Sequence, residues 1–328
     1  MSLKQSLEKI INETKDLLWE NDEWRNRYNN YANKITENLD FIESNQKTFH
    51  QWKPLTVYLN TTSALNAKKS VKYEIRYYGQ TVAKLTGFKS GRHKLSTKGF
   101  DETNLRDFDC AIKLDGVNWA GNEAKEFRKY FKERKTSRNE GNNKKNEEHR
   151  LESLWLSELQ KTKNKILPYA KPVEIGKARF PMPTPISASN HKKVKYSGYY
   201  GGGIDILARV GTGGVNTYLC IIELKDENVK REPPKYAIGQ AVAYTTFIRE
   251  LLRSECGNLW WKIFGFNSEI PKRLNLYAVC LMPSNSLNDY SFKDIELHIE
   301  SDIIKLNYIY FIEKNNKIIE VDTSLEFI

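Results

Sequence analysis

The chain has 328 residues, 39% of them hydrophobic and 12% aromatic, which is enough to bury the cores of one or two domains. Its formal net charge of +11 indicates an anionic partner, and nucleic acid is the usual one. No apolar run approaches the roughly 20 residues of a membrane span, and the acid-rich N-terminus lacks the apolar core of a signal peptide. We therefore expect a cytoplasmic protein that does not enter the membrane.

The cysteines and histidines argue against several kinds of site. The four cysteines are Cys110, Cys220, Cys256 and Cys280. They lie far apart and include no CxxC pair, which argues against a disulfide framework and against a zinc site. The five histidines form no HxH or HExxH cluster, so we expect ordinary surface residues rather than metal ligands.

Residues 1–48 are predicted to form an N-terminal helical segment. Apolar residues such as Leu7, Ile11 and Leu18 recur at helical spacing, and aromatic residues such as Tyr28 continue the stripe. An aromatic stripe of this spacing is more often a packing face than a surface that stacks on bases. We interpret the segment as a packing helix or a helical hairpin.

Residues 49–117 are predicted to form a small β-rich module, with a possible role in recognition. Its short, alternating segments read PLTVYLN, VKYEIRYYG, TVAKLTGF and CAIKL, with glycines between or near them. The second and third segments predict a hairpin turned at Gly79-Gln80. The basic stretch TGFKSGRHKLSTKGF predicts a loop, which is either an ordinary solvated loop or a phosphate grip that includes Arg92 and Lys94.

Residues 118–150 are predicted to be a charged helix followed by a linker, and residues 151–328 a C-terminal domain. The polar stretch TSRNEGNNKK, which is low in apolar residues, favours a flexible boundary between two domains. Beyond it the predicted order is a helix in RLESLWLSELQ, strands in VEIGKARFPM, GIDILARV and TYLCIIELK, a helix in YAIGQAVAYTTFIRELLRSE and a strand in RLNLYAVCLMP. A last pair of strands turns at KNNK. The fold class is thus mixed α+β and α/β, with an α-β-β-β-α-β core in a mixed sheet.

Charged residues stand at two strand ends within this core. Glu223 and Lys225 end an apolar strand and, two positions apart, point to the same side. Asp205 begins the preceding strand, just after three glycines. If the two strands pair across GTGGVN, Asp205 lies beside Glu223. Two neighbouring carboxylates repel unless a cation lies between them, and Mg²⁺ prefers such oxygen ligands, with the Leu224 carbonyl as a further one.

The sequence GID205 followed by IIE223LK225 resembles the PD-(D/E)xK nuclease superfamily over about residues 147–285. Ile204 replaces the proline of the name, a departure that touches no ligand. The resemblance implies that Asp205 and Glu223 bind Mg²⁺, for which Mn²⁺ can substitute. It also implies that Lys225 serves as the catalytic amine.

The following helix adds to the resemblance. Gln240 and Tyr244 are four residues apart, on one helix face, and resemble the QxxxY motif of the RecB-like branch. In that branch such residues face the active site. The superfamily also places a glutamate on the first core helix, for which Glu152 is the preferred candidate and Glu158 the alternative.

The stretch before Asp205 is basic and aromatic. Lys192, Lys193 and Lys195 could contact phosphate groups. Tyr196, Tyr199 and Tyr200 could stack on bases. A solvated loop without such a role is an equal alternative.

Together these features predict a metal-dependent phosphodiester hydrolase, with a DNA endonuclease of restriction, phage defence or repair as the first hypothesis. One alternative is a catalytically silent nucleic-acid-binding or assembly protein on the same fold. Another is an RNA-cutting nuclease or toxin. The expected partner is nucleic acid, with DNA favoured, and a homodimer or a partner subunit stays open.

Overall fold

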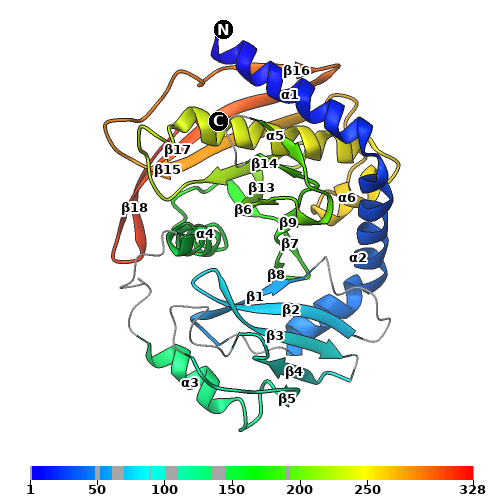
Figure 1. The fold of residues 1–328 in the computed structure, drawn as a ribbon, viewed down its shortest axis with the longest axis vertical. Coiled ribbons are helices and arrows are strands. Elements are labelled where there is room, and N and C mark those ends of the chain that lie inside the picture. The colour runs from blue at the N-terminus through cyan, green and yellow to red at the C-terminus, as the bar shows by residue number, and fades with distance from the viewer. Residues whose placement is uncertain are drawn as a thin grey trace. The chain divides into compact units, whose positions relative to one another are not determined.

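The computed structural model describes residues 2–48, 52–60, 70–88, 90–100, 110–134, 145–188 and 193–327. In that part of the chain the helices are α1 (Leu3–Glu20), α2 (Glu23–Thr48), α3 (Lys125–Glu133), α4 (Lys145–Leu159), α5 (Pro234–Arg253) and α6 (Gly257–Ile263). The chain divides into two compact units. The first comprises Met1–Ala32, Leu154–Val173 and Met182–Ile328, and the second Asn33–Ser153 and Glu174–Pro181. The fold is mixed α/β (Figure 1).

The first unit is built on a mixed sheet in the order β16-β17-β15-β14-β13-β6, with β18 paired to β17. Its strands are β6 (Ala170–Pro172), β13 (Ile206–Gly213), β14 (Asn216–Leu224), β15 (Asn275–Pro283), β16 (Glu296–Ile299), β17 (Asp302–Lys314) and β18 (Lys317–Thr323). Strands β14, β15 and β17 are parallel, and the other pairs are antiparallel. The predicted C-terminal pair is confirmed, with Asn315 and Asn316 at positive φ in its turn.

Helix α5 packs against this sheet, and most of its side chains are buried. It connects β14 to β15 together with α6, which is the long crossover that a parallel strand pair requires. Its residues Ala237 and Ala241 share a core with Ala278 and Cys280 of β15 and with Leu7 of α1. Figure 1 shows α1 and α5 crossing the same region of the unit.

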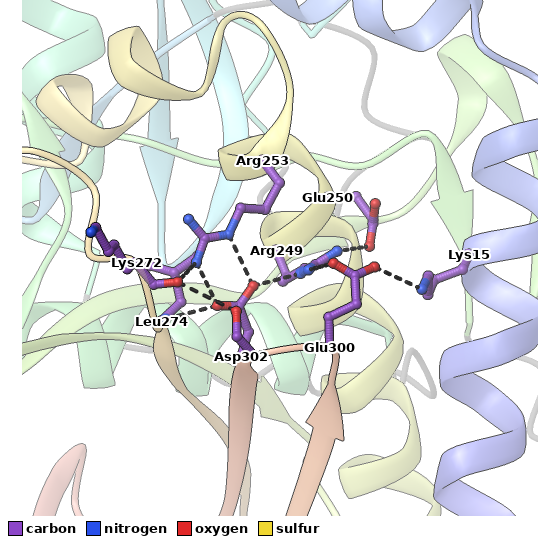
Figure 2. Close-up of polar contacts among 9 residues, drawn as sticks. Lys15, Arg249, Glu250, Arg253, Lys272, Leu274, Glu300 and Asp302 are labelled. Carbon is purple, nitrogen blue, oxygen red and sulfur yellow. Dashed lines mark hydrogen bonds and ion pairs between the residues drawn. The ribbon is translucent and has the colours of Figure 1, made fainter.

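A buried ion-pair network ties α5 to two strand starts (Figure 2). Arg249 Nε and Arg253 Nε donate to Asp302 Oδ2 at 2.8 and 2.9 Å, and the Leu274 N–H donates to Oδ1 at 2.8 Å. Burial alone would raise the pKa of the Asp302 carboxyl. The hydrogen bonds from Arg253, Leu274 and Arg249 outweigh burial and hold this pKa below its ordinary value. The network therefore fixes the C-terminal half of α5.

The second unit contains a sheet in the order β5-β4-β3-β2-β1-β8-β7. Its strands are β1 (Leu55–Leu59), β2 (Ser70–Tyr77), β3 (Gln80–Phe88), β4 (His93–Ser96), β5 (Val117–Asn118), β7 (Glu174–Ile175) and β8 (Ala178–Arg179). The predicted β2–β3 hairpin is present, but its two turn residues are Tyr78 and Gly79, with φ of 45° and 81°. Two positive φ values are typical of a two-residue hairpin turn. The turn therefore consists of residues 78 and 79 and lies one residue earlier than predicted.

Three local predictions were wrong. The segment VEIGKARF does not supply the first core strand, because its short strands β7 and β8 extend the sheet of the second unit and β6 pairs with β13 instead. The basic stretch that starts at Thr86 is not one loop, since β3 runs to Phe88 and pairs with β4. Residues 110–114 form no strand; Leu114 instead pairs with Thr97 through three hydrogen bonds.

Aromatic packing supports the helix predicted after residue 118. In α3, Phe127 and Phe131 are buried with ring centroids 5.0 Å apart, and Phe131 lies 4.9 Å from the ring of Tyr77. Tyr130 lies on the edge of this face and is half-buried. Most of the predicted linker, residues 135–144, lies outside the described residues.

Candidate metal centre

Asp205 lies between β12 (Gly203–Ile204) and β13, beside the end of β14. The two strands pair antiparallel with Ile206 opposite Ile222, as the sequence predicted from the glycine turn. This register brings Asp205 next to Glu223. Asp205 Oδ2 accepts a hydrogen bond of 2.8 Å from the Leu224 N–H, which fixes the carboxylate at the strand end.

Glu223 and Lys225 form a buried ion pair. Lys225 Nζ lies 2.8 Å from Glu223 Oε1, and the two residues are only 9% and 1% exposed. The Lys225 N–H donates to the Leu281 carbonyl at 3.0 Å, so strand pairing to β15 continues through this position. Because residues two apart on a strand share a side, the pairing holds the amine over the carboxylate.

The donor set fits a hard divalent cation. Asp205 and Glu223 each offer a carboxylate oxygen, and these atoms lie within 4.8 Å of each other. Two carboxylates at this spacing favour a cation between them, and oxygen is the ligand that Mg²⁺ and Mn²⁺ take. The Leu224 carbonyl as a further ligand stays a prediction.

Tyr244 of α5 lies close enough to Glu223 and Asp205 to feel their charge, and Gln240 lies four residues earlier on the same helix face. Gln240 Nε2 lies 3.4 Å from Tyr244 Oη, and Tyr244 is 1% exposed. Burial, together with the negative charges of Glu223 and Asp205, raises the pKa of Tyr244 to about 12. Tyr244 is thus a neutral hydroxyl near the acidic pair at any physiological pH.

The glycines before Asp205 allow a close approach to Tyr244. A Cβ on Gly202 would lie 2.3 Å from Tyr244 Oη, and a Cβ on Gly201 would lie 1.8 Å from the Thr184 carbonyl oxygen. Both glycines are therefore required by contact rather than by phosphate binding. The sequence signal was the run of three glycines that precedes the aspartate.

Helix α4 carries four acidic residues, Glu147, Glu148, Glu152 and Glu158, with different surroundings. Glu158 pairs with Lys161, and Glu152 lies 3.5 Å from His149 within one turn. Glu148 lies one turn before Glu152 on the same side of the helix and was not considered from the sequence. The only available signal was the i, i+4 spacing of the two glutamates.

The basic residues proposed to contact phosphate lie in both units. Lys193 and Lys195 of the first unit are exposed, with Lys195 on β11 (Lys195–Tyr196) opposite Ser187 of β10 (Ile186–Ser187). Arg92 and Lys94 of the second unit are also exposed. Lys192 lies outside the described residues.

Comparison with protein families, curated proteins and solved structures finds no match to this chain. Across the described residues, no helix is both long and apolar enough to cross a membrane. Functional assignment therefore depends on the geometry of the residues themselves.

Proposed function

We propose that this chain is a metal-dependent nuclease that hydrolyses phosphodiester bonds of nucleic acid, with DNA as the first expected substrate. The observation that supports it is the buried Glu223–Lys225 pair at the end of β14, with Asp205 beside it. This arrangement combines two metal-binding carboxylates with one amine.

Stability alone explains this pair poorly. Burying both members of an ion pair costs several kcal/mol in desolvation, and well-packed apolar residues in the same place are often as stable or more so. The four residues of β14 before Glu223, from Leu219 to Ile222, are apolar and buried. Apolar residues could also occupy the end of this strand, yet a buried Glu and a buried Lys stand there. This choice favours a chemical role for the two residues.

In this proposal, Asp205 and Glu223 hold the cation and Lys225 acts on the attacking water. A bound Mg²⁺ or Mn²⁺ would neutralise charge on the phosphate and lower the pKa of a water molecule. The Lys225 amine orients that water or stabilises the charge of the transition state. Gln240 and the neutral Tyr244 hydroxyl supply hydrogen bonds to the substrate side.

The helix glutamate that the family resemblance implies stays a prediction, with Glu152 as the preferred candidate and Glu158 as the alternative. Glu158 pairs with Lys161, and Glu152 lies 3.5 Å from His149.

A cleavage assay tests the proposal. The purified chain is incubated with plasmid, linear duplex, single-stranded DNA and RNA, each with Mg²⁺, Mn²⁺ or EDTA. We expect metal-dependent cleavage that Glu223→Gln and Lys225→Met both reduce by at least about 100-fold, since each removes a group that acts in the transition state. The preferred substrate then decides between DNA and RNA.

Lys305→Met is the matched control, because Lys305 pairs with Glu296 at 3.2 Å on the exposed edge of the same sheet. It should cleave like the wild type. Metal-independent cleavage, or full activity in Glu223→Gln, would contradict the proposal. Tight, salt-sensitive binding without any cleavage would instead favour a binding or assembly protein.

A further inference from the structure

Tyr199 is presented to solvent beside the segment that leads into the candidate metal centre. It lies in the 3-10 helix η2 (Gly198–Tyr200) and is 77% exposed. A single exposed aromatic side chain is common and needs no explanation by itself. What sets Tyr199 apart is the group that lies against its ring.

Arg27 of α2 covers the ring of Tyr199 from the protein side. Its Cζ lies 4.5 Å from the Tyr199 ring centroid and 5.6 Å from that of Tyr28, and Arg27 is only 8% exposed. A planar guanidinium so close to a ring makes a cation–π contact and limits the motion of the ring. The ring is therefore held by a buried cation while most of its surface stays open.

The neighbouring residues distinguish Tyr199 from the other tyrosine described beside it. The Tyr196 hydroxyl donates to Glu23 Oε1 at 2.8 Å, so Tyr196 is engaged within the protein. Gly198 has a φ of 55°, a conformation that favours glycine and sets the direction of η2. Lys193 and Lys195 expose their amines on the preceding segment.

The same segment reaches the candidate metal centre within a few residues. Gly202 follows three positions after Tyr199 and packs on Tyr244, and Asp205 follows three positions later. Six residues span at most about 20 Å even when fully extended. A strand of nucleic acid that lies on Tyr199 is thus within a few nucleotides of the carboxylates.

We infer that Tyr199, supported by Arg27, is a stacking platform for an unpaired nucleobase, so that the substrate presents a single-stranded segment next to the cut. Bases inside a duplex already stack on both faces, whereas an unpaired base has a face free for an aromatic side chain. Lys193 and Lys195 would contact the adjoining phosphates. The inference rests on the proposed function for its substrate class, because the platform alone does not show that the strand is cut.

Binding in EDTA tests the platform separately from catalysis. Single-stranded DNA and RNA oligonucleotides and a blunt duplex, each carrying one 2-aminopurine, are titrated with wild-type protein, and anisotropy and 2-aminopurine fluorescence are recorded. We expect tighter binding of a single strand than of the duplex. Tyr199→Ala should weaken single-strand binding about 5- to 150-fold, the range for loss of one stacked base, and abolish the fluorescence change.

Two variants test the geometry. Tyr199→Trp keeps a ring and should retain binding, whereas Arg27→Met removes the cation behind the ring and should weaken it. Tyr169→Ala is the control, since Tyr169 is 48% exposed in the same unit, and it should bind like the wild type. Circular dichroism of each variant shows that the fold is kept.

The outcomes separate the two proposals. Unchanged binding by Tyr199→Ala, or equal losses in Tyr199→Ala and Tyr169→Ala, would overturn the platform even if the wild type cleaves DNA. If binding depends on Tyr199 but the protein cleaves no substrate with Mg²⁺ or Mn²⁺, the stacking role of Tyr199 is supported and the proposed nuclease activity is contradicted.

Discussion

At the scale of single residues, the position of Lys225 has a consequence for metal binding. Its ammonium lies 2.8 Å from Glu223 Oε1 and compensates the charge that a divalent cation would otherwise compensate. In the proposed nuclease, a cation bound to Glu223 would compete with Lys225 for the charge of this carboxylate and would leave the amine freer to act on the substrate. The proposed metal site and the ion pair would thus share one carboxylate.

Metal binding should therefore stabilise the fold through Glu223. With free Mg²⁺ or Mn²⁺ at 100 times its Kd, we expect the free energy of unfolding to rise by about 2.7 kcal/mol in the wild type and by much less in Glu223→Gln. Thermal melts with and without EDTA measure the rise. Glu296→Gln, which changes an exposed glutamate, should respond like the wild type, and an equal response from Glu223→Gln would contradict the site.

Asp302 is expected to be the largest single ionic contribution to stability. It is 1% exposed and receives hydrogen bonds from Arg249, Arg253 and the Leu274 N–H. Asp302→Ala should cost about 3–5 kcal/mol, because it removes the buried acceptor shared by Arg249, Arg253 and the Leu274 N–H. Urea denaturation measures this cost, and Glu250→Ala, at the edge of the network, should cost less than about 1 kcal/mol.

The depressed pKa of Asp302 also sets the sign of the acid response. The folded state keeps this carboxyl ionised to lower pH than the unfolded chain does. Its contribution is therefore complete above the ordinary aspartate pKa of about 4 and is lost as the pH falls through the lower folded value. Asp302→Ala should remove that part of the acid sensitivity.

At the scale of elements, the β13–β14 hairpin places both candidate metal ligands. Gly211 has a φ of 131° at a register shift, and a Cβ there would lie 1.9 Å from the Asn216 carbonyl oxygen. The bulge therefore requires glycine, and it sets which residue of β13 lies beside Glu223. The hairpin converts two distant sequence positions into one acidic pair.

Gly211→Ala should destabilise the hairpin by about 1–3 kcal/mol or more, since it combines backbone strain with a clash against backbone atoms. It should also lower metal affinity, measured by the same thermal shift. Gly214→Asn is the matched control: Gly214 has a φ of 58°, no atom lies within 4 Å of an added Cβ, and asparagine tolerates that conformation. Equal effects of both changes would show that the bulge does not set the site.

At the scale of the whole molecule, buried and half-buried tyrosines in both units resist ionisation of their hydroxyl groups. Burial is the main cause that raises the pKa of Tyr77, Tyr196, Tyr244 and Tyr277, each to about 12. In the unfolded chain these hydroxyls ionise near pH 10. Between these values the folded state holds more protons than the unfolded state does, so stability falls as the pH rises.

We therefore expect the free energy of unfolding to decline from about pH 10 upward, by at most about 1.4 kcal/mol per pH unit for each tyrosine. Urea midpoints at pH 9, 10 and 11 measure the slope. Tyr277→Phe should reduce this slope and should change the free energy of unfolding at pH 7 by no more than about 1 kcal/mol. A constant midpoint up to pH 11 would contradict the burial argument.

The sequence by itself determined the local elements and the acidic pair. Helical spacing in α5, period-two alternation in β2 and the glycine turn between β13 and β14 are patterns of neighbouring residues, and each survives in the structure. The proximity of Asp205 and Glu223 followed from one hairpin. Such features depend on contacts between residues that are close in the sequence, so the order of the residues is enough to predict them.

Only the tertiary structure decided which element pairs with which. The segment VEIGKARF was expected in the core sheet but joins the sheet of the second unit, because a short strand can pair with any open sheet edge. The pairs Arg27–Tyr199 and Arg249–Asp302 join residues far apart in the sequence. Their formation depends on how whole faces pack and how long loops close, which no local pattern records.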